Sequence, residues 1–166
     1  MSTQSKSQGP AVGLYTPEER LRRDSTVWTV VQGVLAPVQF LVFLVSLALV
    51  LRYLLTGEGY ALAAWSIVAK TVVLYIIMVT GAIWEKVVFG QYLMAPAFFW
   101  EDVFSFLVIG LHTAYLWALF TGALTPVPLM ILALTAYAAY VINAVQFILK
   151  LRAARLQVAT FQEATA

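Results

Sequence analysis

Apolar residues dominate four long stretches of the chain, and shorter segments richer in polar residues separate them. The stretches run over about 27–55, 61–84, 103–120 and 127–149. A helix needs about 20 apolar residues to cross the hydrocarbon core of a bilayer. None of the stretches shows the period-two alternation that is typical of a transmembrane β-strand. The pattern therefore predicts four transmembrane helices.

The segments between these stretches predict how the helices are connected. TGEG at 56–59 and TGALTP at 121–126 are short and contain the turn-forming residues glycine and proline. Short turns make neighbouring helices antiparallel. The segment at 85–102 is longer and crosses between the second and third spans. We therefore expect an all-α, polytopic membrane protein whose four transmembrane helices form an up-down bundle.

The ends of the chain differ in composition from the bundle. We expect residues 1–13, which are small and polar, to form a disordered tail, and 157–166 to form a flexible C-terminal tail, on either side of a single membrane domain at 14–156. The string TPEERLRRD at 16–24 begins with a threonine N-cap, a proline and a capping-box glutamate. It predicts a short amphipathic N-terminal helix that leads into the membrane.

Composition narrows the class of protein further. Of the 166 residues, 62% are hydrophobic and only 11% are charged, whereas soluble domains carry about 25% charged residues. This excludes a nucleic-acid module and an ordinary soluble enzyme. The chain has no cysteine and a single histidine, His112, so one chain cannot form a disulfide, a thiolate metal site or a multi-histidine metal site. The sequence predicts no metal site in the protein.

Basic residues are distributed unevenly between the two ends of the predicted bundle. Lysine and arginine accumulate on the cytoplasmic side of membrane proteins. Eight of the ten basic residues fall on the side of the termini and the 85–102 segment, namely Lys6, Arg20, Arg22, Arg23, Lys86, Lys150, Arg152 and Arg155. We therefore expect a multi-pass membrane protein with both termini and the 85–102 segment in the cytoplasm.

Polar side chains within the spans are the strongest indication of function, because they are costly in a bilayer. Glu101, Ser105 and His112 lie within about 40° of one another on a helix and form one stripe. Lys70 lies deep in the second span, where we expect it either to extend toward the nearer surface or to bind an anionic group in the bundle. Lys70 belongs to the outer half, whereas Glu101, Ser105 and His112 belong to the predicted cytoplasmic half. The remaining polar residues of the cytoplasmic half are Gln32, Gln39, Glu85, Asp102, Asn143 and Gln146. We expect these groups to line one inward-open cavity.

The segment between the second and third spans repeats the pattern W-E-x-V, once at Trp84 and once at Trp100. The residues between these repeats, Tyr92 among them, are too apolar for a solvated loop. We expect the segment to lie in the membrane interface or to fold over the mouth of the bundle as a lid, with Trp84, Trp100 and Tyr92 near a bound ligand. Anchoring in the interface is the alternative role for these aromatic residues.

The polar residues favour proton-transfer chemistry on an apolar ligand. Burial keeps a carboxylic acid protonated at neutral pH, and histidine titrates near neutrality. We expect Glu101 and Glu85 to donate a proton and activate water, with Asp102 as an alternative and His112 binding the ligand or relaying a proton. No glycine-rich phosphate loop and no nucleophile–base motif is present. The residues alone indicate a membrane proton-transfer enzyme or a binder of a hydrophobic ligand.

Several strings extend this interpretation. LYTPEERLRRD, VQGVLAPVQFLVFLVSL, GAIWEKVVFGQYLMAPAFFWEDVFS, LHTAYL and YVINAVQFILKLRAARL resemble the 3-vinyl bacteriochlorophyllide hydratase family over about 14–156. The resemblance implies a hydro-lyase of bacteriochlorophyll synthesis that adds water to the C3 vinyl group of a (bacterio)chlorophyllide. It also implies that the protein lies in a bacterial inner membrane, either cytoplasmic or intracytoplasmic photosynthetic. It implies no external cofactor, because the magnesium belongs to the substrate. His112 is a candidate axial ligand of that magnesium, and Gln39, Ser105, Asn143 and Gln146 are candidate substrate-binding residues.

Two other functions fit the same pattern. A tetrapyrrole carrier or assembly subunit would bind the pigment without changing it. A small proton-coupled exporter would need an acidic residue in the first span, which this chain lacks. Besides pigment, water and lipid, we expect as partners a second copy of the chain or other enzymes of bacteriochlorophyll synthesis, and no nucleic acid.

Overall fold

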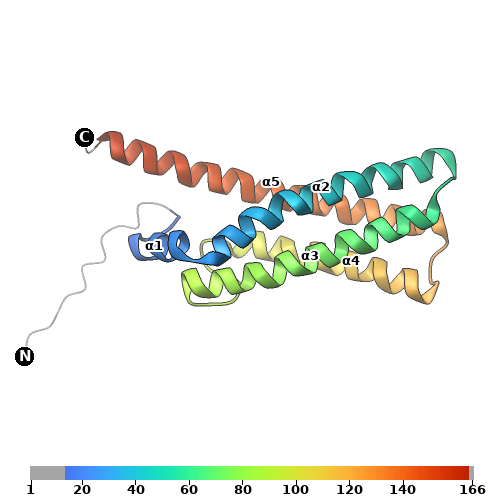
Figure 1. Ribbon diagram of the computed structural model, residues 1–166, viewed down its shortest axis with the longest axis horizontal. Helices are drawn as coiled ribbons and strands as arrows, with labels where there is room; N and C mark the ends of the chain where they lie inside the picture. The colour runs from blue at the N-terminus through green and yellow to red at the C-terminus, as the bar shows by residue number, and fades with distance from the viewer. Residues whose placement is uncertain (1–13, 165–166) are drawn as a thin grey trace, which may run out of the picture.

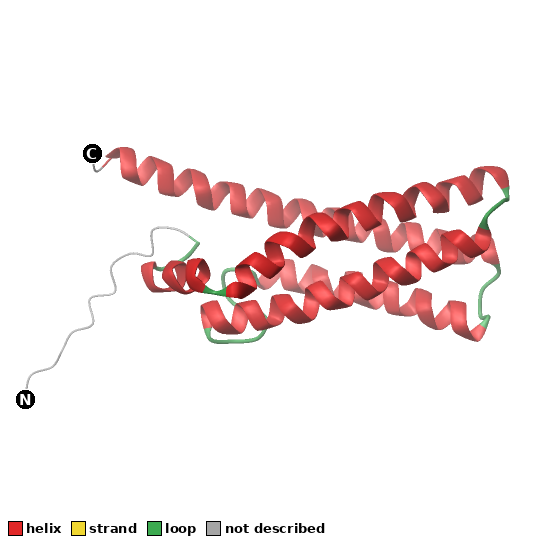
Figure 2. Ribbon diagram, in the orientation of Figure 1, coloured by secondary structure: helices red, strands yellow, loops and turns green. Residues whose placement is uncertain are grey.

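The computed structural model describes residues 14–164, with side chains for 14–156. Within that range the chain forms helices and short loops and no strand, as Figure 2 shows. The elements are α1 (Pro17–Ser25), α2 (Val27–Thr56), α3 (Tyr60–Phe89), α4 (Phe99–Thr121) and α5 (Pro126–Ala164). Four helices are long and apolar enough to cross a membrane, and they begin and end near the predicted spans. The predicted all-α membrane fold is confirmed.

The helices begin and end at residues whose chemistry explains the boundaries. The Thr16 hydroxyl accepts a hydrogen bond from the backbone N–H of Glu19, and the Glu19 carboxylate accepts one from the N–H of Thr16. This is the predicted capping box of α1. Helices α2, α3 and α4 end at Gly57, Gly90 and Gly122, each with a positive φ that glycine adopts without strain.

The bundle consists of two helical hairpins, α2–α3 and α4–α5 (Figure 1). The helices within each hairpin pack closely along their lengths, whereas contacts between the hairpins are sparser. Helix α1, the α3–α4 loop and the C-terminal part of α5 lie at one end of the bundle, and the two tight turns lie at the other. We call these the loop end and the turn end.

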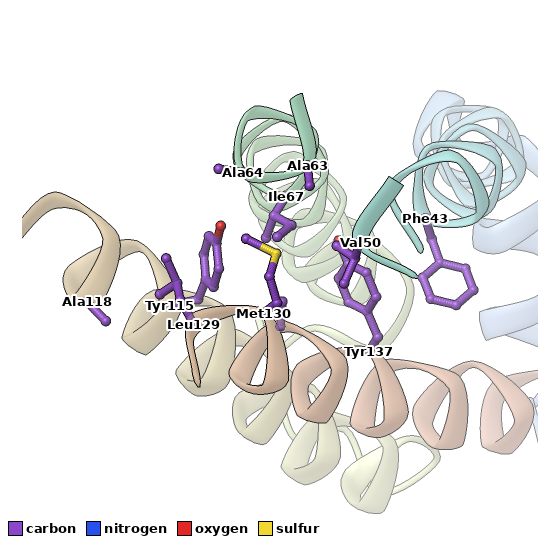
Figure 3. Close-up of a cluster of buried hydrophobic side chains, with 11 residues drawn as sticks. Phe43, Val50, Ala63, Ala64, Ile67, Tyr115, Ala118, Leu129, Met130 and Tyr137 are labelled. Atoms are coloured by element: carbon purple, nitrogen blue, oxygen red, sulfur yellow. The ribbon is translucent and has the colours of Figure 1, made fainter. Parts of the chain in front are cut away.

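The turn end contains the largest apolar core. Figure 3 shows its side chains between the two hairpins, with Phe43 and Val50 from α2, Ile67 from α3, Tyr115 from α4 and Met130 from α5. By contrast, many large apolar side chains on the outer faces of the long helices are exposed. Exposure of this kind is typical of surfaces that face lipid. The protein is therefore a membrane protein whose helices pack an apolar core at one end.

Helices α3 and α4 are longer than the apolar runs predict. Both W-E-x-V repeats are helical, and the loop between the two helices is reduced to residues 90–98. Helix α3 continues past the predicted end at Trp84 because no glycine or proline follows before Gly90. Helix α5 likewise continues through Ala164, so residues 157–164 of the expected C-terminal tail are helical. The predicted tail at 1–13 lies outside the described residues.

Candidate active site

Two buried carboxyl groups face each other at the loop end. Glu85 lies in the last turns of α3 and Asp102 in the first turn of α4, and their side chains lie within hydrogen-bond reach of each other. Only 6% of Glu85 and 3% of Asp102 is exposed. Two carboxyl groups can hydrogen-bond to each other only when one of them carries a proton. A pair of this kind can provide a proton donor and a proton acceptor in one place.

The α3–α4 loop closes over this pair and binds it through its backbone. The N–H of Met94 donates to Asp102 Oδ2 at 2.7 Å, and the N–H of Ala95 donates to Glu85 Oε2 at 3.3 Å. Met94 has a φ of 60°, which is uncommon for a residue with a side chain. The two carboxyl groups help to hold the loop in this conformation. The prediction that the segment folds back over the bundle agrees with the burial of Ala95 and Phe98.

The third acid at this end has a different partner. Lys150 of α5 donates to Glu101 Oε2 at 2.6 Å, and the ammonium group lies 5.3 Å from the centre of the Phe98 ring. The Ser105 hydroxyl, one turn further along α4, accepts a hydrogen bond of 2.8 Å from Asn143 Nδ2 of α5. These contacts join α4 to α5. Glu101 is therefore paired with a cation, and Asp102 lies next to Glu85.

His112 lies far from the acids. Ten residues of α4 separate it from Asp102, which is about 15 Å along the helix axis. His112 is fully buried; its Nδ1 contacts the Val108 carbonyl oxygen at 2.8 Å, and its Nε2 contacts Lys70 Nζ at 2.9 Å. Both ring nitrogens are therefore engaged. The axial-ligand role predicted for His112 would require it to release Lys70.

Lys70 does not extend to the membrane surface, which corrects the first of the two expectations for it. Its side chain is fully buried in the bundle, and its ammonium group lies 4.2 Å from the centre of the Tyr140 ring and 5.2 Å from that of Tyr137. The direction of its side chain explains this. Lys70 is on the inner face of α3 together with Ile67 and Leu74, so the surrounding helices enclose it.

Unpaired amide atoms lie between the acids and Lys70. Both polar side-chain atoms of Gln39, together with Asn143 Oδ1 and Gln146 Oε1, are buried and have no hydrogen-bond partner within the described part of the chain. The register of α2 against α5 places two of these residues at one level. The ring centres of Phe43 in α2 and Tyr140 in α5 are 5.0 Å apart. One helical turn nearer the loop end, Gln39 of α2 therefore lies opposite Asn143 of α5.

An unpaired amide buried in a protein costs about 1–3 kcal/mol, so these atoms are expected to meet a ligand or water. Gln32, by contrast, is satisfied, because its Nε2 donates to the hydroxyl of Thr80 at 2.8 Å.

The three aromatic residues predicted near the ligand have different environments. Trp84 is half-buried, and its indole N–H donates to the Thr29 hydroxyl at 2.9 Å. Trp100 and Tyr92 are 66% and 60% exposed, as expected for residues in the membrane interface. Trp84 also packs edge-on against Phe98, which lies beside the loop.

A cluster of aromatic rings closes the loop end beneath α1. Tyr15 stacks on Phe89 at 5.7 Å, and the guanidinium of Arg23 lies 4.7 Å from the centre of the Tyr15 ring. Burial raises the pKa of Tyr15, and the nearby Arg23 partly opposes this shift. The cluster anchors α1 to the bundle and leaves the carboxyl pair on the inner side of an apolar cover.

The described residues include no group of three or more histidine, aspartate, glutamate or cysteine side chains placed to hold a metal ion. One hollow lies on the outer surface between α2 and α3 and is lined by Leu41, Val42, Val45, Ser66 and Ala69. It is apolar and remote from the acids. The polar groups that the sequence assigns to one cavity are instead divided among several contacts. Glu101 and Ser105 pair with α5, Gln32 pairs with Thr80 of α3, and Glu85 of α3 lies next to Asp102 of α4.

Sequence reasoning missed Lys150 as the partner of Glu101, the loop backbone as the partner of the acid pair, and Tyr137 and Tyr140 as the neighbours of Lys70. Only Lys150 left a signal in the sequence. It follows the end of the fourth predicted span, at the depth at which Glu101 precedes the third.

Comparison with known proteins identifies the family. Residues 15–153 match the family described as 2-vinyl bacteriochlorophyllide hydratase. A 2-vinyl bacteriochlorophyllide hydratase of Rhodobacter capsulatus is 71% identical over 147 residues, which cover 89% of this chain and 85% of the relative. One of Cereibacter sphaeroides is 70% identical over 149 residues, covering 90% of this chain and 92% of the relative. No solved structure matches the chain significantly. The chain belongs to the 2-vinyl bacteriochlorophyllide hydratase family.

Proposed function

We propose that this protein adds water across the vinyl group of a bacteriochlorophyllide and that the Glu85–Asp102 pair carries out the proton transfers. The names of the relatives call this group the 2-vinyl group, whereas the family name used in the sequence analysis calls it the 3-vinyl group. The activity is that of a hydro-lyase in bacteriochlorophyll synthesis. The observation that carries the site assignment is the mutual contact of two buried carboxyl groups under the loop.

The chemistry of hydration needs one proton donor, one water and one proton acceptor. A protonated carboxyl group gives its proton to the terminal carbon of the vinyl group. The positive charge that forms on the inner vinyl carbon is delocalised into the conjugated macrocycle. Water attacks this carbon, and a carboxylate takes the proton that the water loses. The product is a 1-hydroxyethyl group, and the pair of acids ends with the same number of protons as before.

Asp102 is a better partner for Glu85 than Glu101 is. The Lys150 ammonium binds Glu101 at 2.6 Å, whereas Asp102 and Glu85 are bound by backbone N–H groups and by each other. General acid–base catalysis requires a group that exchanges its proton with the substrate at hydrogen-bond distance. We assign the roles of proton donor and proton acceptor to Glu85 and Asp102. The Glu101–Lys150 ion pair has a structural role beside the site.

The unpaired side-chain amides are suited to bind the magnesium at the centre of the pigment. Magnesium prefers oxygen ligands, and Gln39, Asn143 and Gln146 have free side-chain oxygens. Asn143 lies beside Ser105, which is between Asp102 and His112 along α4. In this proposal one of these amide oxygens provides the axial ligand of the substrate magnesium, directly or through water. Ser105 supports the arrangement by fixing Asn143. The sparse contacts between the two hairpins favour entry of a flat pigment between them.

We also propose the orientation and location of the protein. The loop end, with Lys86, Lys150, Arg152 and Arg155, faces the cytoplasm of a bacterial inner or intracytoplasmic membrane. Water then reaches the acid pair from the cytoplasmic side, while the pigment enters from the lipid.

The test is turnover by the purified protein in lipid nanodiscs supplied with vinyl bacteriochlorophyllide alone. We expect a blue-shifted absorption band and a mass gain of one water without nucleotide, flavin, reductant or added metal. Strict dependence on NADPH or iron would overturn the proposal. Tight binding of the pigment with no change of mass would instead identify a carrier.

A further inference from the structure

Lys70 is a fully buried lysine that the proposed chemistry does not use. Its ammonium group lies in the interior of the bundle. The Nζ atom is 2.9 Å from Nε2 of His112, a side chain that has no negative charge. Within the described part of the chain no carboxylate lies within ion-pair distance of it. The nearest acidic residues in the sequence are Glu58, which precedes α3, and Glu85, which lies near the end of α3.

Buried charges in proteins are normally paired, and a lysine inside a membrane bundle marks a binding or transport function by default. The faces of Tyr137 and Tyr140 offset part of the cost of the charge. They provide no negative counter-charge. The site is therefore suited to a ligand that brings an anionic group of its own into the bundle.

The position of Lys70 relative to the acid pair fits such a ligand. His112, which contacts Lys70, lies about 15 Å along α4 from Asp102. The unpaired amides of Gln39 and Asn143 lie between these two levels. A bacteriochlorophyllide carries its vinyl group on one side of the macrocycle, its magnesium in the centre and an unesterified propionate side chain toward another side. Along the bundle, the acid pair corresponds to the vinyl group, the amides to the magnesium and Lys70 to the propionate.

We propose that Lys70 binds the propionate carboxylate of the pigment and thereby selects the free-acid pigment over its esters. The proposal rests on the hydratase function proposed above and adds a specificity determinant to it. His112 acts as a positioning residue, since its Nδ1 is held by the Val108 carbonyl and its Nε2 orients the ammonium group. When the carboxylate enters, it takes a hydrogen bond from the ammonium group and no covalent bond changes.

The experiment compares two substrates, the free-acid vinyl pigment and the methyl ester of its propionate group. Hydrogen bonds to charged groups contribute enough binding energy to give a preference of about 10- to 100-fold. We expect the wild-type protein to prefer the free acid by that factor in kcat/KM. Lys70→Met is expected to lose the preference, so that it hydrates the free acid and the methyl ester with similar kcat/KM. Activity on the ester shows that the variant is folded and that its acid pair is intact.

A matched control removes a cation at the loop end. Arg152 is exposed, so Arg152→Met is expected to keep the preference for the free acid. The proposal is overturned if the wild-type protein hydrates acid and ester equally well, or if the preference survives in Lys70→Met. It is also overturned if Arg152→Met, and not Lys70→Met, abolishes the preference, because the carboxylate then lies at the loop end. Each of these results leaves hydration itself intact, whereas failure to hydrate either pigment would refute the proposed function.

Discussion

Replacing Glu85 by glutamine separates proton transfer from loop anchoring, because the amide keeps the shape of the side chain. In Glu85→Gln the amide oxygen still accepts the N–H of Ala95, and the amide nitrogen can donate to Asp102. The structural loss is at most about one hydrogen bond, or about 1 kcal/mol. This is less than a tenfold change in the folding equilibrium of a protein that is stable by about 5–15 kcal/mol. Nearly all of the variant therefore remains folded.

Loss of a general acid or base lowers the rate by about 10²–10⁴-fold. We therefore expect Glu85→Gln and Asp102→Asn to bind the pigment as the wild-type protein does and to hydrate it at least about 100-fold more slowly. The assay follows the blue shift of the absorption band under single-turnover conditions, with pigment affinity measured separately. Glu58→Gln is the matched control, since Glu58 is an exposed carboxylate at the turn end.

If both amide variants keep more than about half of the wild-type rate, the carboxyl pair does not catalyse proton transfer. If Glu101→Gln is as slow as Glu85→Gln while Asp102→Asn retains the wild-type rate, the reacting pair is Glu85 with Glu101, as the sequence alone suggested.

Three further predictions concern the amides, the membrane topology and the loop. Gln39→Leu should weaken pigment binding about tenfold or more and raise thermal stability, because it removes unpaired buried atoms; unchanged affinity in a binding titration would contradict the role of Gln39. Reporter fusions after Gly57 and Gly122 should lie outside the cytoplasm and a C-terminal fusion inside, and a cytoplasmic signal after Gly57 would reverse the orientation. Met94→Gly should retain hydratase activity within about threefold, because glycine adopts a φ of 60° more readily and leaves the backbone N–H available to Asp102; loss of activity would show that the Met94 side chain contacts the pigment.

The fold was predictable because it depends on local patterns. Runs of apolar residues predict the spans, and Thr16 with Glu19 predicts the start of α1. The stripe of Glu101, Ser105 and His112 was also predictable, since one helical period determines it, and all three side chains are buried. Contacts between helices were not predictable in this way. They depend on the register of α3 against α4, which no pattern within a single helix encodes.

The acids at the loop end illustrate the limit. Glu101 and Asp102 are adjacent in sequence but lie about 100° apart around α4. This rotation turns Glu101 toward Lys150 of α5 and Asp102 toward Glu85 of α3. Lys70 is a similar case. Its depth in the span was clear from the sequence, but its direction depends on which face of α3 the other helices cover.

The most direct test of the central claim is the origin of the oxygen atom in the product. Purified protein in nanodiscs would be incubated with vinyl bacteriochlorophyllide in water enriched in heavy oxygen, and the pigment would be analysed by mass spectrometry. Hydration at the Glu85–Asp102 pair predicts one heavy oxygen in the new hydroxyl group, formed equally well with and without dissolved oxygen gas. Pigment recovered unchanged in mass, or a hydroxyl group whose oxygen comes from the dissolved gas, would contradict the account.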